Sequence, residues 1–195
     1  MLLGIPQSLA TLLAIALFYA MDFALIRRYD KHRRASGSGR SWDFTFFIFI
    51  MVAILILQPI LLPQISFSTP ARWGLLIQLL GVVLILDALA LHFWSRLHLQ
   101  QFYAERVEVQ PEHKVIDTGP YKLMRHPVIT SFFGIAAGLF LINPGLTTLA
   151  ALMYTIWDFT RAARQEEDLL LRTLPGYAEY ARRTPRFLPR LWRSR

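Results

Sequence analysis

The residues best suited to chemistry lie in two short polar stretches of an otherwise apolar chain. The first stretch, GPYKLMRHPVIT at residues 119–130, places Arg125 and His126 directly before Pro127 and an apolar segment. Proline suits the first turn of a helix, because the amide that it lacks has no intrahelical partner there. Arg125 and His126 then lie at a helix N-terminus, where backbone amides and the helix dipole favour an anion. The pair forms an anion site, or it serves structure, with Arg125 reaching lipid headgroups and His126 capping the helix.

The second stretch, RAARQEEDLLLR, occupies residues 161–172 and contains a pair of adjacent acids, Glu166 and Glu167. On a helix these acids fall on faces next to that of Arg161. If the helix lines a cavity, the two carboxylates can hold a cationic ligand group or the hydroxyls of a ribose. Otherwise the stretch is a solvated helix with local ion pairs, such as Arg164 with Glu167.

The elements that must position these stretches are membrane helices. The chain has 195 residues, of which 54% are hydrophobic and 17% charged, against about 25% charged residues in a typical soluble domain. Three apolar segments can cross a hydrocarbon core of about 30 Å, namely residues 9–26, 44–62 and 73–94. Two shorter segments, 128–142 and 146–160, flank an Asn-Pro-Gly turn signal and form a hairpin that barely spans. We predict an all-α, polytopic membrane helix bundle of about five transmembrane helices, including this short hairpin, followed by a cytoplasmic C-terminal helix.

Basic residues gather in three of the polar connections. Residues 27–43 hold six Lys or Arg, residues 95–127 hold five and the tail from residue 161 holds nine, whereas residues 63–72 hold one. The positive-inside rule then places the N-terminus outside and the polar stretches and C-terminus in the cytoplasm. We expect an integral membrane protein of the bacterial inner membrane.

The chain divides into two functional regions by this distribution. Residues 1–94 would form three N-terminal transmembrane helices, and residues 95–195 a cofactor-binding catalytic region built from a cytoplasmic segment, the hairpin and a C-terminal helix. The deepest acid of the first region is Asp87, seven residues before Trp94. An Asp at the centre of a membrane helix costs about 2.5–3.5 kcal/mol. We therefore expect Asp87 to face the bundle interior, where it contacts substrate or pairs with His92 or a buried amide.

Composition also excludes several classes of site. The chain lacks cysteine, so disulfides, thiol nucleophiles and Cys-based metal sites are absent. Its histidines show no metal-ligand spacing, and we predict no metal site. The formal net charge is +8, and the basic residues cluster beside apolar blocks. This pattern is typical of membrane proteins that are oriented by positive charge and contact anionic lipid headgroups. We predict membrane lipid rather than nucleic acid as a partner.

Taken in order, the motifs from about residue 94 to residue 191 resemble the isoprenylcysteine carboxyl methyltransferase family of small integral membrane methyltransferases. GPYKLMRHP is similar to the family's G-P-Y-x-x-x-R-H-P, and LPGYAEYARRTPRFLPRLW is similar to a Tyr-containing stretch with a short R-x-x-P tail. Between them lie an Asn-Pro turn and a Trp…Arg…Glu-Glu pattern (Asn143, Pro144, Trp157, Arg161, Glu166, Glu167). The chain differs from the family at Ile129, where an aromatic residue is usual, and at Leu174-Pro175, where Phe is common before the glycine.

The resemblance implies S-adenosyl-L-methionine as the cofactor, bound without a Rossmann domain in a cytoplasm-facing pocket. It implies catalytic roles for Arg161, which would orient the nucleophile, and for Glu167. Tyr177 would be a pocket or scaffold position. The implied cofactor-binding residues are Tyr121, Arg125, His126, Pro127, Glu166 and Glu167.

The methyl acceptor that we expect is a small or lipid-like carboxylate, thiol or amine reached from the bilayer. Methyl transfer is an in-line displacement that needs alignment and desolvation more than acid–base chemistry. A site with an anion-binding pair, two carboxylates and no metal suits this reaction, independently of the resemblance.

Two other functions remain open from the sequence. The chain resembles sterol reductases in its hairpin and tail, and such an enzyme would bind NADPH. Tails of those reductases carry D-E and Y-G-x-D-W patterns, whereas this chain has Glu166-Glu167 and PGYAEY. The other alternative is a non-catalytic membrane scaffold, for which Ile129 is the main sign.

Overall fold

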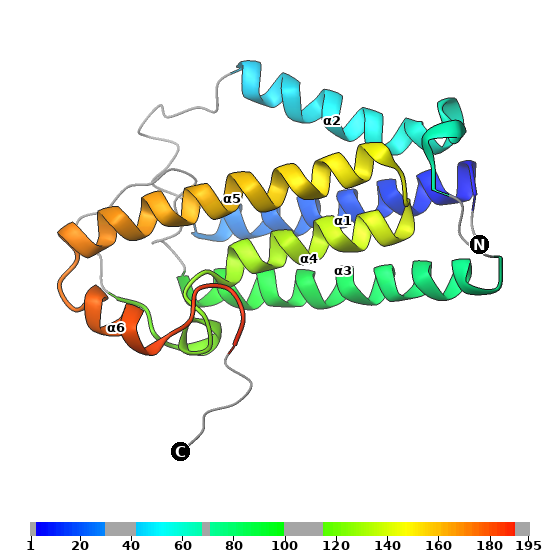
Figure 1. Ribbon diagram of the computed structural model, residues 1–195. Coiled ribbons are helices and arrows are strands. Elements are labelled where there is room, and N and C mark those ends of the chain that lie inside the picture. Colours follow the sequence, from blue (N-terminus) through cyan, green and yellow to red (C-terminus); the bar gives the residue numbers. More distant parts are fainter. Residues whose placement is uncertain (1–2, 30–41, 68–70, 100–114, 190–195) are drawn as a thin grey trace.

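The computed structural model describes residues 3–29, 42–67, 71–99 and 115–189. Its regular elements there are helices (Figure 1). The six α-helices are α1 (Ile5–Tyr29), α2 (Trp42–Leu61), α3 (Ala71–Leu99), α4 (Pro127–Ile142), α5 (Leu146–Thr173) and α6 (Tyr177–Arg183), with 3₁₀ turns η2 (Pro63–Ile65) and η4 (Gly119–Lys122). In the described part of the chain, the all-α prediction is therefore confirmed.

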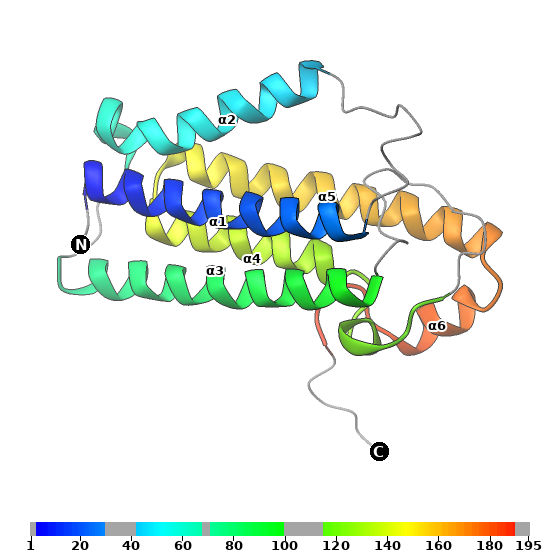
Figure 2. The same ribbon diagram turned by 180° about the vertical axis from the view of Figure 1, so that it is seen from behind.

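Helices α1, α3, α4 and α5 lie side by side with similar axis directions, and α6 and η4 gather at one end of this bundle (Figures 1 and 2). Two described segments, Ile5–Leu25 and Trp73–Leu99, are long and apolar enough to cross a membrane. Helix α4 has 16 residues and reaches about 24 Å at 1.5 Å per residue. The predicted count of five crossings remains a prediction, as does the orientation, because residues 30–41 and 100–114 of the basic connections lie outside the described residues.

The short hairpin is present with one change of length. Helix α4 begins at Pro127 and ends at Ile142, as predicted, but α5 continues as one helix of 28 residues to Thr173. No Gly or Pro interrupts residues 146–173, so the acidic stretch extends the hairpin arm well past the start of α4. This extension carries Glu166 and Glu167 to the end of the bundle where α6 lies (Figure 1). Helix α3 also runs unbroken through residues 94 and 95, and the two-region division remains a prediction.

Close packing of α3 on α4 depends on glycine. A Cβ on Gly138 would lie 2.7 Å from the carbonyl oxygen of Gly81 and 2.5 Å from the Ile85 side chain. The two backbones therefore approach more closely than larger residues allow, as in many membrane helix pairs. This contact fixes where α4 begins relative to the end of α3.

A neutral polar network surrounds the turn of the hairpin, which we call the amide network and define as Gln7, Gln58, Gln78, Asn143 and Thr148. Gln7 and Gln78 each donate to the Ile142 carbonyl at 3.0 Å. Asn143 accepts from Gln7 at 3.1 Å and donates to the carbonyl of Leu55 at 3.2 Å. The last carbonyls of a helix lack intrahelical partners, so these side chains satisfy the end of α4.

A second buried cluster joins α1, α3 and α4. His92 Nδ1 lies 3.1 Å from Ser131 Oγ, and His92 Nε2 lies 3.5 Å from Asp22 Oδ1. Our expectation for Asp87 was wrong, because this side chain is exposed. Ile85, Ala88 and His92 define the buried face of α3, and Asp87 projects from another face. His92 thus pairs with the acid of α1 instead.

Candidate functional site

The predicted site residues lie on elements that meet at one end of the bundle: η4, the start of α4, the second half of α5, and α6 (Figure 1). Gly119 explains how η4 reaches the end of α3. Its φ is +55°, and a Cβ there would lie 2.4 Å from the His98 ring. Only glycine combines this conformation with this contact. The Tyr180 hydroxyl then donates to the Tyr121 carbonyl at 2.7 Å, which joins η4 to α6.

Arg125, His126 and Pro127 begin α4 as predicted. His126 is the N-cap residue and Pro127 the first residue of the helix. Two amides beside the helix start are occupied: the Arg125 amide donates to the Pro185 carbonyl at 2.8 Å and the His126 amide to the Arg186 carbonyl at 3.0 Å. The tail of the chain therefore pairs with the segment before α4.

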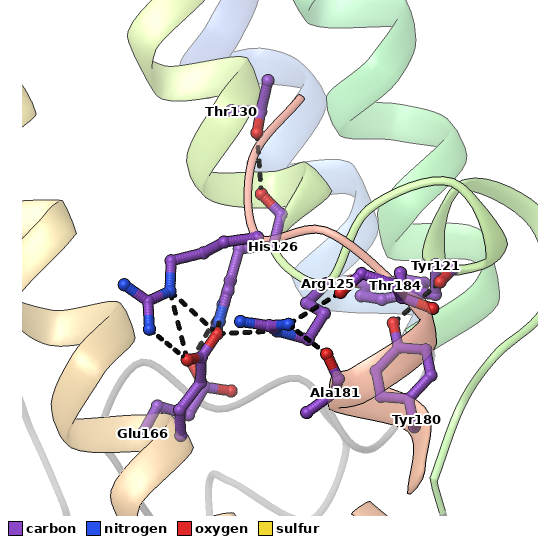
Figure 3. Close-up of polar contacts among 10 residues, drawn as sticks. Tyr121, Arg125, His126, Thr130, Glu166, Tyr180, Ala181 and Thr184 are labelled. Carbon is purple, nitrogen blue, oxygen red and sulfur yellow. Dashed lines mark hydrogen bonds and ion pairs between the residues drawn. The ribbon is translucent and has the colours of Figure 1, made fainter. Parts of the chain in front are cut away.

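An anion does lie against this Arg-His pair, and it is a side chain of the protein. Arg125 Nε and His126 Nε2 each lie 2.9 Å from Glu167 Oε1. Arg186 Nε lies 3.1 Å from both Glu167 oxygens, and Arg186 Nη2 lies 2.5 Å from Oε2. We call these four residues the Glu167 cluster; Figure 3 shows the contacts around Arg125 and His126.

Arg125 has a further structural role. Its Nη1 donates to the carbonyls of Ala181 and Thr184, at 2.7 Å each. These carbonyls belong to the last turn of α6 and to its C-cap residue, where a cation is favourable. Arg125 thus fastens α6 to the start of α4 and to Glu167 together (Figure 3).

The two adjacent acids differ in environment. Glu167 is buried, which alone would raise its pKa, but hydrogen bonds from His126, Arg186 and Arg125 hold the pKa of this carboxyl well below its usual range. Glu166 has a side chain that is 45% exposed, with Oε2 lying 3.6 Å from His126 Nδ1. Partial desolvation by the surrounding protein raises the pKa of Glu166, His126 opposes this, and the Glu167 charge adds to it. Glu167 is therefore a fixed anion, whereas Glu166 is the acid with freedom to meet a ligand.

A small pocket opens beside the Glu167 cluster. Its polar lining includes Arg125, His126 and Glu166, and its remaining lining residues are Leu99, Val115, Ile116, Tyr121, Leu170, Leu174, Tyr177 and Tyr180. Burial and the nearby charge of Glu167 raise the pKa of the Tyr177 phenol, so this ring stays neutral. The lining thus combines aromatic and aliphatic side chains with a carboxylate and an imidazole.

Most of the predicted site residues thus meet at one place. Tyr121, Arg125, His126 and Glu166 line the pocket, Glu167 lies behind His126, and Pro127 is buried as the first residue of α4. Their functional roles remain predictions.

Arg161 is not brought to the pocket. It is exposed on α5, with its guanidinium carbon 5.8 Å from the centroid of the Trp157 ring. Glu167 follows it by six positions, which is about 240° around a helix. Its predicted catalytic role therefore lacks a contact with the Glu167 cluster.

Sequence reasoning missed Arg186. The sequence feature that contains Arg186 is the R-x-x-P tail, which starts at Arg186 and ends at Pro189, but no charge partner could be assigned to Arg186 from spacing.

Among the described residues, no group of three or more potential metal ligands of the His, Cys, Asp and Glu types occurs. The expected absence of a metal remains a prediction for the chain.

The fold and the site together define a class: helical membrane proteins with a short hairpin and a charged site at one end. Within this class, residues 79–172 match the model of the isoprenylcysteine carboxyl methyltransferase (ICMT) family. This match covers just under half of the chain and confirms the resemblance found in the sequence.

Three curated relatives are similar to this chain. A probable protein-S-isoprenylcysteine O-methyltransferase from Oryza sativa is 26% identical over 183 residues, covering 90% of this chain and 92% of the relative. The nickel-cobalt-cadmium resistance protein NccN of Alcaligenes xylosoxydans is 40% identical over 81 residues, covering 40% of this chain. The cobalt-zinc-cadmium resistance protein CzcN of Cupriavidus metallidurans is 37% identical over 79 residues, also covering 40% of this chain. The matches span only 37% and 36% of the length of these two resistance proteins.

A solved structure shows the same fold. The chain is similar to the eukaryotic intramembrane Ras methyltransferase ICMT, with a TM-score of 0.68 and 19% sequence identity. The similarity covers 93% of this chain and 66% of that structure. It supports the helical membrane architecture.

Proposed function

We propose that this chain is an S-adenosyl-L-methionine-dependent methyltransferase of the membrane, with its site at the end of the bundle where α6 lies. The observation that carries the proposal is the Glu167 cluster, which holds His126 and the neighbouring Glu166 at the edge of an apolar, aromatic pocket. The match of residues 79–172 to the ICMT family model supports the same activity.

The residues of the pocket fit this cofactor by their chemistry. Tyr121 and Tyr177, with the leucines beside them, offer surface for a flat purine. The Glu166 carboxylate suits an ammonium group or ribose hydroxyls, and His126 adds an imidazole nitrogen on the same side. We propose that Tyr121, Arg125, His126, Pro127 and Glu166 form the cofactor-binding set.

When bound, the cofactor supplies an electrophilic methyl group on a sulfonium. This chain's residues would then orient and desolvate rather than exchange protons. Glu167 orients His126, and Arg125 holds α6 in place as a wall of the pocket. Arg161 is exposed beside Trp157 on α5, and we propose that it meets an acceptor approaching from the bilayer.

We propose a small or lipid-like acceptor that carries a carboxylate, thiol or amine. The apolar spans that lead to the site support entry from the bilayer. The residues 95–195 would form the catalytic region and residues 1–94 its membrane support. We further propose an inner-membrane location with the N-terminus outside and the site in the cytoplasm, from the distribution of basic residues.

Calorimetric titration of the detergent-solubilised chain tests this function. S-adenosylmethionine and S-adenosylhomocysteine should bind, and NADPH should not. Binding of NADPH alone would favour the reductase alternative, and binding of none of the three would favour the scaffold. A screen of thiols, carboxylates and lipid amines with methyl-labelled cofactor then identifies the acceptor.

A further inference from the structure

The chain after α6 forms a short segment, residues 184–189, that we call the C-terminal strap. It lies against the start of α4 and supplies Arg186 to the Glu167 cluster. We propose that Arg186 is a positioning residue of the proposed cofactor site: it fixes the Glu167 carboxylate, and through it His126. This inference rests on the proposed function, and it adds a residue of the C-terminal strap to the proposed site.

The first argument is the distribution of hydrogen bonds on the carboxylate. Glu167 Oε1 receives three donors, from Arg125, His126 and Arg186. Among the described residues, the donors to Oε2 come from Arg186 alone, through Nε at 3.1 Å and Nη2 at 2.5 Å. A guanidinium that bonds both oxygens sets the plane of a carboxylate, which a single donor does not. Arg186 is thus the residue that prevents rotation of the Glu167 carboxylate.

The second argument is burial. The side chain of Glu167 is 7% exposed, and Arg125 and His126 are 13% and 5% exposed, whereas Arg186 is 34% exposed. Arg186 therefore covers the carboxylate from the solvent side. Without it, Oε2 would lose its described donors and the site would be more open to water.

The third argument is that the strap docks without the Arg186 guanidinium. Main-chain carbonyls of Pro185 and Arg186 accept from the amides of Arg125 and His126, and the Phe187 carbonyl accepts from Thr130 Oγ1 at 2.9 Å. The Phe187 ring also lies against His126 and Phe133, with centroid distances of 6.0 and 5.2 Å. The guanidinium therefore bonds Glu167 and is not needed to hold the strap. Because the main-chain bonds remain, Arg186→Ala should fold with the strap in place.

The consequence concerns His126 and the pocket. His126 Nε2 bonds Glu167 Oε1, and its Nδ1 faces Glu166 at the pocket. A carboxylate that can rotate no longer fixes the plane of this ring, so the groups that would hold the cofactor lose their alignment. The effect of Arg186 on cofactor binding therefore passes through Glu167 and His126.

The test compares Arg186→Ala, Arg186→Lys and the control Arg182→Ala, which removes an exposed arginine paired with Glu179. Calorimetry with S-adenosylhomocysteine should show at least tenfold weaker binding for Arg186→Ala. Arg186→Lys should recover part of the loss because it keeps one charged donor, and Arg182→Ala should bind as the unmodified chain does. Unchanged affinity of Arg186→Ala, with the unmodified chain binding normally, would overturn the inference.

An acid-unfolding series separates this inference from the proposed function. The groups facing Glu167 are Arg125, His126 and Arg186, with Glu166 and Tyr177 nearby. Because the folded-state pKa of Glu167 is lowered, its contribution to stability is present above the ordinary carboxyl pKa and is lost as the pH falls below it. Removal of Arg186 raises that folded-state pKa, so Arg186→Ala should unfold at a higher pH than Arg182→Ala. If the unmodified chain binds no cofactor, the proposed function fails; equal acid unfolding of the two variants contradicts the fixing of Glu167 itself.

Discussion

The two ends of the α4–α5 hairpin both bury polar side chains, and they do so in different ways. The amide network at the turn is built from neutral groups that satisfy the carbonyls at the end of α4. The Glu167 cluster at the other end is built from charges, and it lies beside a pocket that Glu166 and His126 face.

This difference indicates that the amide network serves the fold, whereas the Glu167 cluster serves a ligand site. Neutral amides complete a helix end at the least cost in desolvation, whereas buried ion pairs often stabilise no more than apolar residues would. A charged cluster whose neighbours face a pocket is better explained by a ligand than by stability. We therefore predict that variants in the Glu167 cluster weaken cofactor binding, whereas variants in the amide network lower the unfolding temperature.

The largest effect is expected from Glu167→Ala. The change leaves Arg125, His126 and Arg186 without their shared anion and should weaken S-adenosylhomocysteine binding at least tenfold, or about 1.4 kcal/mol. Calorimetry of the folded variant, verified by circular dichroism, measures the loss. Affinity equal to that of the unmodified chain would contradict the role of the cluster.

Asn143→Ala should affect stability instead. The variant removes the bonds from Gln7 and to Leu55 at 3.1 and 3.2 Å, and loss of a buried polar partner costs about 1–3 kcal/mol. The thermal unfolding temperature should fall while cofactor affinity stays the same. A matching loss of affinity would mean that the two ends of the hairpin are coupled.

Gly119→Ala tests the support of the pocket. The added Cβ would meet the His98 ring, and the residue would keep an unfavourable positive φ, at a cost of about 1–2 kcal/mol. A modest fall in both unfolding temperature and cofactor affinity is expected, because η4 carries Tyr121 of the pocket. Gly176→Ala is the control, since it has a positive φ but no neighbour within 4 Å.

The smallest effect concerns pH. The pKa of Glu166 is raised by partial desolvation and by Glu167, with His126 opposing the shift, so its ionised form is lost at a higher pH than for an ordinary glutamate. If ionised Glu166 holds the cationic part of the ligand, affinity should fall a few-fold as the pH drops through this pKa. Glu166→Gln should flatten the profile, and a profile identical in both proteins would exclude Glu166 as its source.

Much of this end of the molecule could be predicted from sequence, because local rules govern it. Pro127 marked the start of α4, and the Asn-Pro-Gly turn marked the end of the first arm of the hairpin. The pairing of residues distant in sequence could not be predicted. For Glu167 the spacing offered Arg164 as a possible local partner, yet its partners come from the residues just before α4 and from the strap.

The failure at Asp87 has a similar cause. A charge in an apolar segment indicates burial in general, but the packed face of α3 is set by Gly81 and Ile85 against α4. That contact joins residues distant in sequence, so the buried face of α3 could not be predicted from the apolar segment alone. Two of the polar groups that lie inside the bundle there, His92 and Ser131, follow no pattern that spacing alone reveals.

A side-by-side titration of His126→Ala and Asn143→Ala with S-adenosylhomocysteine tests the central claim most directly. Both variants remove a buried polar side chain from an end of α4. We predict at least tenfold weaker binding for His126→Ala, or about 1.4 kcal/mol, and unchanged affinity for Asn143→Ala. Equal affinities in the two variants would contradict the assignment of the cofactor site to the Glu167 cluster.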